Sequence, residues 1–146
     1  LLCVDINYRG NTMDMQIVKA WEANKQAVKS VFEEKHPESY KDVIRAVVKM
    51  LHDSSDEYYK PDPERIHEID DGHYQGTLVY VIGSTGYQPD EYWYVKVGYG
   101  SCSGCDTLQA ICGYEDGKPT EEQVKDYMTL ALHIIQGMRK MGDSDA

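Results

Sequence analysis

The first half of the chain has the hydrophobic spacing of two amphipathic helices. From residue 14 to residue 35 apolar side chains recur every three or four positions, and His36-Pro37 ends the run because proline disfavours helical backbone in the residue before it. A second stripe opens near Ser39, whose hydroxyl can cap free backbone amides, and it ends near residues 53–55. We expect the following positions to face the core: Ile17, Val18, Trp21, Val28, Val31, Phe32, Val43, Ile44, Val47, Val48 and Leu51.

The spacing then changes from helical to alternating. The polar stretch 54–64, which contains two prolines, predicts a loop. Residues 66–69 alternate in polarity, residues 70–72 read Asp-Asp-Gly, and residues 74–82 are rich in β-branched and aromatic side chains. Because a turn sequence between two such segments is typical of paired antiparallel strands, this part of the chain predicts a β-hairpin.

The aromatic segment 92–99 predicts a third strand. Successive side chains of a strand point to opposite faces, so one face of this strand carries Trp93, Val95, Val97 and Tyr99. If that face is buried, the opposite face is exposed and presents Tyr92, Tyr94 and Lys96. Amphipathic aromatic side chains of this kind are enriched in binding surfaces.

Two further helices complete the pattern. Residues 105–111 predict a short helix, and a long helix begins with Thr120 and Gln123 as a capping-box pair and ends near Arg139, Lys140 and Gly142. Its predicted buried stripe is Val124, Tyr127, Met128, Ala131, Ile134, Ile135 and Met138. Together the elements predict an α+β fold, a three- to four-stranded antiparallel meander with helices packed on one face.

Length and composition limit the possible functions. A chain of 146 residues suits one domain over residues 1–146, in which residues 1–12 form a flexible or non-native N-terminal segment. The chain has no run of apolar residues long enough to span a bilayer, and its first residues lack the basic region of a secretory signal. We therefore expect a cytoplasmic protein with no membrane partner.

The charge balance bears on partners. The formal net charge is −10, from 25 acidic and 15 basic residues, and binding to phosphate backbones needs clustered Lys and Arg. Direct nucleic-acid binding is therefore disfavoured and a protein partner is expected, with the oligomeric state left open. No nucleotide-binding, zinc-protease or hydrolase motif occurs, so the sequence favours a non-enzymatic role without deciding the question.

The densest chemical feature is the segment 98–106, Gly-Tyr-Gly-Ser-Cys-Ser-Gly-Cys-Asp. Its glycines permit a tight turn that can aim the thiols of Cys102 and Cys105 at one point. With Cys112 they make three soft ligands for a tetrahedral zinc site. The fourth ligand stays open among His67, His73 and Cys3.

The same loop has three other interpretations. A Cys-x-x-Cys sequence between a strand and a helix start suits thiol redox chemistry, although the chain lacks the βαβ order of thioredoxin-like folds. One cysteine could instead be a nucleophile served by His73 or His67. Finally, small residues and thiols can simply fill space where a strand and a helix approach closely.

The segment from about residue 92 to residue 111 resembles a group of small uncharacterised, chiefly phage-encoded proteins with a Tyr-Gly-Ser-Cys-Ser-Gly-Cys-Asp-like loop. The shared signature is Gly100, Cys102, Gly104, Cys105 and Asp106. The resemblance implies a viral origin, and hence the host cytoplasm, and it implies no known activity.

The leading hypothesis from the sequence is a small protein-interaction module. Its expected binding residues are Tyr92, Tyr94, Lys96, Tyr99, Gly100, Cys102, Gly104, Cys105 and Asp106. The alternative is a thiol-dependent or zinc-stabilised protein or enzyme centred on Cys102 and Cys105, with Cys112 as a further ligand.

Overall fold

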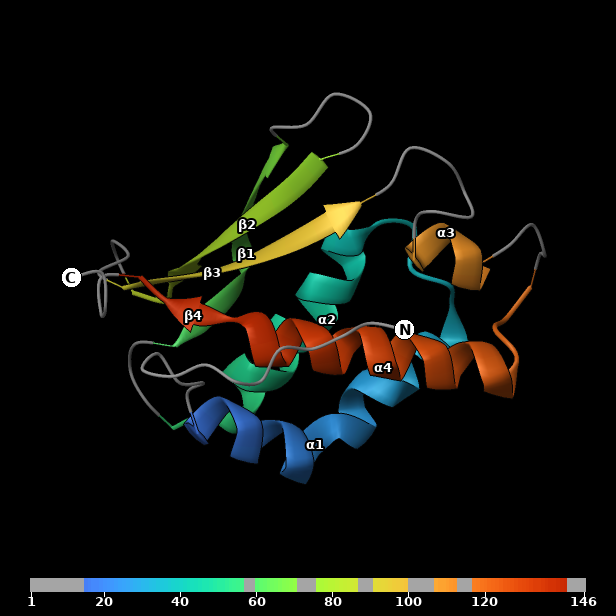
Figure 1. The fold of residues 1–146 in the computed structure, drawn as a ribbon. Coiled ribbons are helices and arrows are strands. Elements are labelled where there is room, and N and C mark those ends of the chain that lie inside the picture. Colours follow the sequence, from blue (N-terminus) through green and yellow to red (C-terminus); the bar gives the residue numbers. More distant parts are fainter. Residues whose placement is uncertain are drawn as a thin grey trace.

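The computed structural model of the 146-residue chain describes residues 15–56, 60–70, 76–86, 91–99, 107–112 and 117–141. The elements are α1 (Met15–Glu34), α2 (Tyr40–Ser54), β1 (Pro61–Asp70), β2 (Gly76–Ser84), β3 (Tyr92–Tyr99), α3 (Thr107–Cys112), α4 (Glu121–Gly137) and β4 (Arg139–Lys140). Figure 1 shows the helices gathered on one side of the strands. The predicted α+β fold with an antiparallel sheet is therefore confirmed.

The start of α2 differs from the expectation in one detail. Ser39 has the extended backbone of an N-cap residue, but its side chain makes no capping hydrogen bond. Instead the carboxylate of Asp42 accepts a hydrogen bond of 2.8 Å from the backbone N–H of Glu38, and the Asp42 N–H donates to the Ser39 carbonyl at 3.0 Å. A side chain inside the first turn thus binds a backbone N–H just ahead of the helix.

The four strands follow each other in the order β1-β2-β3-β4, and every neighbouring pair is antiparallel. The prediction of a loop over 54–64 is wrong at its end, because β1 already begins at Pro61. β1 is an edge strand, where a proline can lack an N–H without breaking a ladder bond. The pairing of β1 with β2 shifts register between Pro61 and Ile66.

The chain after α4 differs from the expectation, in which Arg139 and Lys140 only end the helix. Residues 139–140 do more than close the helix, because they form β4 and pair with Tyr94 and Trp93 of β3. The Arg139 guanidinium folds back and donates to the Gln136 carbonyl at 2.8 Å, which occupies a free carbonyl at the end of α4.

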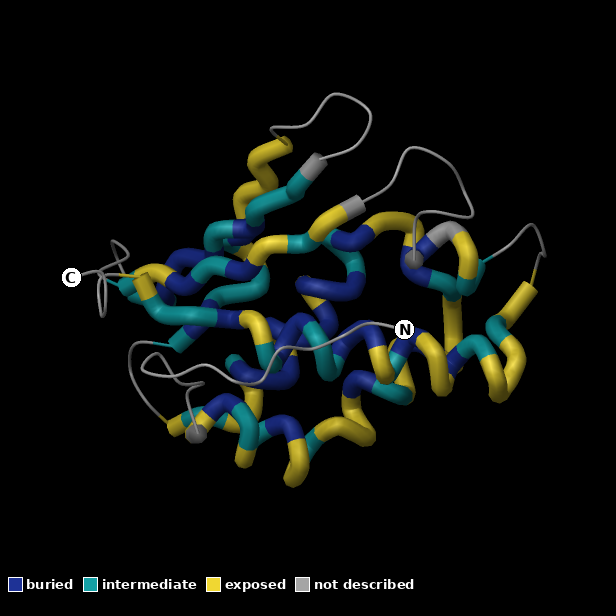
Figure 2. The backbone as a smooth tube through the Cα atoms, in the orientation of Figure 1, coloured by how far each residue is buried: buried dark blue, intermediate teal, exposed yellow. Residues whose placement is uncertain are grey.

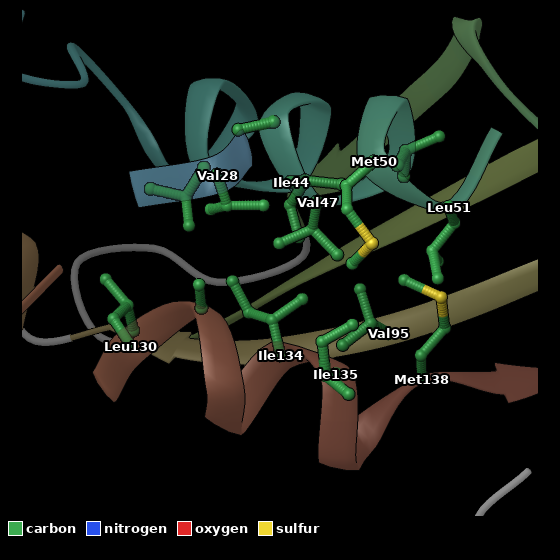
Figure 3. Close-up of a cluster of buried hydrophobic side chains, with 14 of the residues drawn as sticks. Val28, Ile44, Val47, Met50, Leu51, Val95, Leu130, Ile134, Ile135 and Met138 are labelled. Carbon is green, nitrogen blue, oxygen red and sulfur yellow. The ribbon is translucent and has the colours of Figure 1, made fainter. Parts of the chain in front are cut away.

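The helices cover the sheet in two layers. α2 packs against β1 and α4 packs against β3, while α1 packs on α2 and α4. The side chains between these layers are buried (Figures 2 and 3). The cluster drawn in Figure 3 joins α1, α2, α4 and β3 through Val28, Ile44, Val47, Met50, Leu51, Val95, Leu130, Ile134, Ile135 and Met138. Burying each such side chain contributes about 1.5–3 kcal/mol.

Candidate functional site

Within the described residues, one face of the sheet has no helix packed against it. Strand alternation turns Tyr80, Ile82, Trp93 and Val95 to the helices, where all four are buried. Their sequence neighbours therefore point to the opposite face, away from the helices. We call this the outer face; its side chains are His67, Ile69, Thr77, Val79, Val81, Tyr92, Tyr94, Lys96 and Arg139.

The register of the strands brings these side chains into rows. His67 lies opposite Val81, which lies opposite Tyr94. In the next row Ile69 lies opposite Val79, which lies opposite Lys96. Because directly opposed residues of antiparallel strands have adjacent side chains, the two rows form one continuous surface with Val79 and Val81 at its middle.

Exposed apolar side chains concentrate on and beside this face. In the described residues the exposed large hydrophobic side chains are Val31, Ile69, Tyr92 and Met141, at 48%, 50%, 39% and 47% exposure. Ile69 and Tyr92 belong to the outer face, and Met141 lies beside Tyr92, to whose carbonyl its N–H donates at 2.8 Å. Val31, on α1, lies elsewhere. The expectation that Val31 faces the core is therefore wrong. Ile69 and Tyr92 lie two strands and two rows apart on this face, with the half-buried Val79, Val81 and Tyr94 between them. A continuous apolar surface marks an interaction site more than single scattered side chains do.

The charge of the outer face differs from that of the whole chain. None of its side chains is acidic, although the chain has 25 acidic and 15 basic residues. Lys96 is exposed there and forms no ion pair within the described residues, and His67 is exposed at the edge of the same surface. The outer face is therefore apolar and aromatic, with a positive margin formed by Lys96 and Arg139.

The structure bears on some of the predicted binding residues. Trp93 and Val95 are buried, so Tyr92, Tyr94 and Lys96 occupy the outward positions that the sequence predicts for them. Tyr99 ends β3, but its side chain is outside the described part of the structure. The predicted binding residues Gly100, Cys102, Gly104, Cys105 and Asp106 all lie outside the described residues.

Cys112 is the one cysteine within the described part of the chain, and it is a partly buried free thiol at the end of α3. Hydrogen bonds to side chains of the neighbouring helices hold α3 in place. The Gln123 amide donates to the carbonyls of Ile111 and Cys112, at 3.1 and 3.5 Å. At the other end of α3, the N–H of Leu108 donates to the Tyr40 hydroxyl at 3.1 Å. α3 is thereby tied to both α2 and α4.

Cys112 belongs to a cluster of three titratable side chains, which we call the thiol cluster: His36, Cys112 and Tyr127. The Nδ1 atom of His36 and the hydroxyl oxygen of Tyr127 are 2.7 Å apart, and their rings meet edge to face. Burial raises the pKa of the Tyr127 hydroxyl well above its usual value, and the charge and hydrogen bonding of Cys112 raise it further. Tyr127 therefore keeps its proton and remains a donor.

The sequence missed two members of this cluster. It treats His36 as the end of a helix and Tyr127 as part of a buried stripe, and the two residues are 91 positions apart. Nothing in the local pattern could have paired them. Of the predicted histidine partners, His67 lies on the outer face and not in the thiol cluster, while His73 and Cys3 lie outside the described residues.

A metal site is not complete within the described part of the chain, where no group of three or more His, Cys, Asp or Glu side chains could hold an ion. Two of the three predicted thiol ligands, Cys102 and Cys105, lie beyond that part. The described helices also include none that is long and apolar enough to cross a membrane.

A groove of about 880 Å³ lies between α1 and α4. Trp21, Met128 and Leu132 contribute its apolar lining, while lysines and glutamates from both helices contribute charges of both signs. This mixture selects no particular ligand chemistry, so the groove is a weaker candidate than the outer face.

Comparison of the chain with protein-family models, with curated proteins and with solved structures found no match.

Proposed function

We propose that this protein is an interaction module that binds another protein through the outer face of its sheet. The observation that carries the proposal is the position of Ile69, Tyr92 and Met141, three exposed large apolar side chains on or beside the outer face. Burying apolar area in a complex gains about 25 cal/mol for each Å² removed from water. Tyrosine adds a hydroxyl that can bond to a partner at the margin of such a surface.

The charges suggest which partner fits. The outer face has the cations Lys96 and Arg139 at its margin and no acidic side chain, so a second copy of the same face would offer no ion pair. A segment with apolar side chains flanked by carboxylates would complement both the apolar middle and the positive margin. We therefore propose an acidic, amphipathic protein segment as the partner.

Site-specific photo-crosslinking tests the location of the surface. A crosslinking amino acid placed at Ile69 is compared with the same group placed at Val31, which is equally exposed but lies on α1. We expect a discrete crosslinked partner from position 69 and none from position 31. The same products from both positions, or products only from Val31, would contradict the proposal.

A charge reversal tests the proposed chemistry of the partner. Lys96→Glu should weaken binding of the partner captured at Ile69 by about 2- to 30-fold, because an exposed ion pair and a new like-charge contact are each worth about 0.2–1 kcal/mol. Lys125→Glu makes the same change on exposed α4 and should leave the affinity unchanged. Affinity is measured by calorimetry with the identified partner.

The contribution of the cysteine loop is tested separately. If Cys102→Ser together with Cys105→Ser leaves the affinity for this partner unchanged, then the loop has no part in binding and the outer face acts alone. A loss of affinity in the double variant would extend the surface to residues 100–106.

A further inference from the structure

The groove between α1 and α4 is lined by charges whose positions are ordered, although their mixture alone selects no ligand. The two helices run in opposite directions, because Lys118, just before α4, forms an ion pair of 3.5 Å with Glu34 at the end of α1. Both helices line the groove with positions four residues apart, which lie on one face of a helix. These positions are Lys25, Lys29 and Glu33 on α1, and Glu121, Lys125 and Thr129 on α4.

The opposite directions of the helices determine which charges lie across the groove from each other. Glu33 lies at the same end of the groove as Glu121 and Glu122, whereas Lys29 and Lys125 lie near its middle. Within the described residues neither of these two lysines forms an ion pair. The groove therefore has an acidic end and a cationic middle.

The other end of the groove is neutral and more apolar. There the ammonium group of Lys25 forms an ion pair of 3.2 Å with the carboxylate of Glu22. Met128 and Leu132 are partly buried, and the buried Trp21 also lines the groove. A partner that covers Met128 and Leu132 would remove further apolar surface from water, which favours binding.

The length and the spacing of the groove suit a third helix. From Trp21 to Glu33, α1 rises about 18 Å, or about three turns, at about 1.5 Å per residue. A helix presents side chains at the same four-residue spacing as α1 and α4, so a ridge on its surface can pack into the groove between them. Binding of an amphipathic helix in an apolar groove is a general mode of peptide recognition.

We propose that this groove binds an amphipathic helix of a partner protein. The apolar stripe of that helix is flanked by a carboxylate at its middle, which pairs with Lys29 and Lys125, and by a basic side chain at one end, which pairs with the acidic end of the groove. A second copy of this chain does not fit, because a two-fold arrangement that joins two grooves at their middles brings like-charged lysines together. The site is separate from the outer face and does not rest on the function proposed for it.

Two synthetic peptides test the proposed charges. Each is a helix with a stripe of leucines and an arginine at one end, held helical by a covalent staple because short helices are marginal in water. The peptides differ only at the middle, where the first has Glu and the second has Lys. We expect the Glu peptide to bind at least about 4-fold more tightly, because it exchanges two like-charge contacts for two exposed ion pairs. Calorimetry with the full chain measures both affinities.

Reversing the two lysines of the groove should reverse this preference. In a variant that combines Lys29→Glu with Lys125→Glu, we expect the Lys peptide to bind more tightly than the Glu peptide. A purely structural role of these lysines would not invert the order. The matched control is Lys96→Glu, which reverses a lysine of the outer face and should leave the preference for the Glu peptide unchanged. Circular dichroism verifies that each variant is folded.

NMR of the unsubstituted chain locates the peptide without any substitution. In ¹⁵N-labelled protein the Glu peptide should shift the amide resonances of α1 and α4 and leave those of β3 in place. Shifts confined to β3 would instead place the peptide on the outer face, so the two proposed surfaces are tested independently.

Three results would overturn the proposal. The first is a Glu peptide that binds more weakly than about 1 mM, or no more tightly than the Lys peptide. The second is a preference that the combined Lys29→Glu and Lys125→Glu variant does not change, or amide shifts that avoid α1 and α4. The third is self-association of the unsubstituted chain that this variant alters, which would assign the groove to a second copy.

Discussion

His133 shows how burial of a single side chain couples folding to pH. It lies on α4, and its Nδ1 atom is buried without a partner within the described residues. Burial lowers the pKa of this histidine below its usual value of 6.5, because the charged ring is disfavoured out of water. The unfolded chain therefore takes up a proton at a higher pH than the folded chain does. The folded state is therefore stabilised relative to the unfolded state above about pH 6.5, and this contribution to the free energy of unfolding is lost as the pH falls below that value.

This predicts a specific change in thermal stability. The Tm of the protein should fall between about pH 7.5 and pH 5.5, and His133→Gln should reduce that fall because glutamine does not titrate. Asp53 affects a different pH range, since hydrogen bonds from His52 and Lys49 hold the pKa of its carboxyl below 3.8. Scanning calorimetry over a pH series measures the slope of Tm against pH in the unsubstituted protein and in His133→Gln. Equal slopes in the two proteins would show that His133 does not contribute.

At the scale of the element, the start of α4 joins local capping to tertiary structure. The Thr120 hydroxyl accepts from the Gln123 N–H at 3.1 Å, and the Gln123 side chain accepts from the Thr120 N–H at 2.9 Å. The side-chain NH₂ group of Gln123 donates to the last carbonyls of α3, those of Ile111 and Cys112. One capping box therefore satisfies the N–H groups of Gln123 and Thr120 at the start of α4, and its Gln123 also holds the end of α3 where Cys112 lies.

Removing this cap should destabilise the protein. Thr120→Ala is expected to lower the free energy of unfolding by about 0.5–2 kcal/mol, measured by urea denaturation. Thr129→Ala is the matched control, because Thr129 is exposed within the same helix and alanine is the better helix former there. The control should leave stability unchanged or slightly raised. An equal effect of both substitutions would mean that the cap contributes nothing beyond helix propensity.

At the scale of the whole molecule, one core connects the two helical layers to the sheet. The two tryptophans lie in different layers, Trp21 in α1 and Trp93 in β3, and both are buried. Their neighbours belong to one hydrophobic cluster that also includes α2 and α4. A shared core of this kind is typical of chains that unfold in a single cooperative transition.

The tryptophans make this testable. The Trp21→Phe variant keeps only Trp93, so its fluorescence reports on the sheet. The Trp93→Phe variant keeps only Trp21, so its fluorescence reports on α1. We expect the fluorescence midpoint and the circular-dichroism midpoint to coincide within each variant, even though each substitution lowers stability. Separate midpoints would show that α1 and the sheet unfold independently, against the single domain that the sequence predicts.

Much of the fold follows from periodicity that can be observed within one segment. The helices at Met15–Glu34 and Tyr40–Ser54 and the strand at Tyr92–Tyr99 lie within a residue or two of their predicted bounds. Alternation also predicts the outward side chains of β3 once Trp93 is taken as buried. The early start of β1 was missed because prolines usually mark loops, and an edge position that tolerates them is defined only by the neighbouring strands.

The candidate sites depend on contacts between residues far apart in the chain, which the periodicity of a single segment cannot predict. The sequence by itself determined the elements, the amphipathic strand and the thiol-rich loop, because each depends on residues close together in the chain. The tertiary structure decided that Ile69, Tyr92 and Met141 lie on or beside the outer face, and that His36 meets Tyr127 across 91 positions. The reason is physical: which side chains share a surface depends on strand order, register and layer packing, and these are settled only when the whole core is buried.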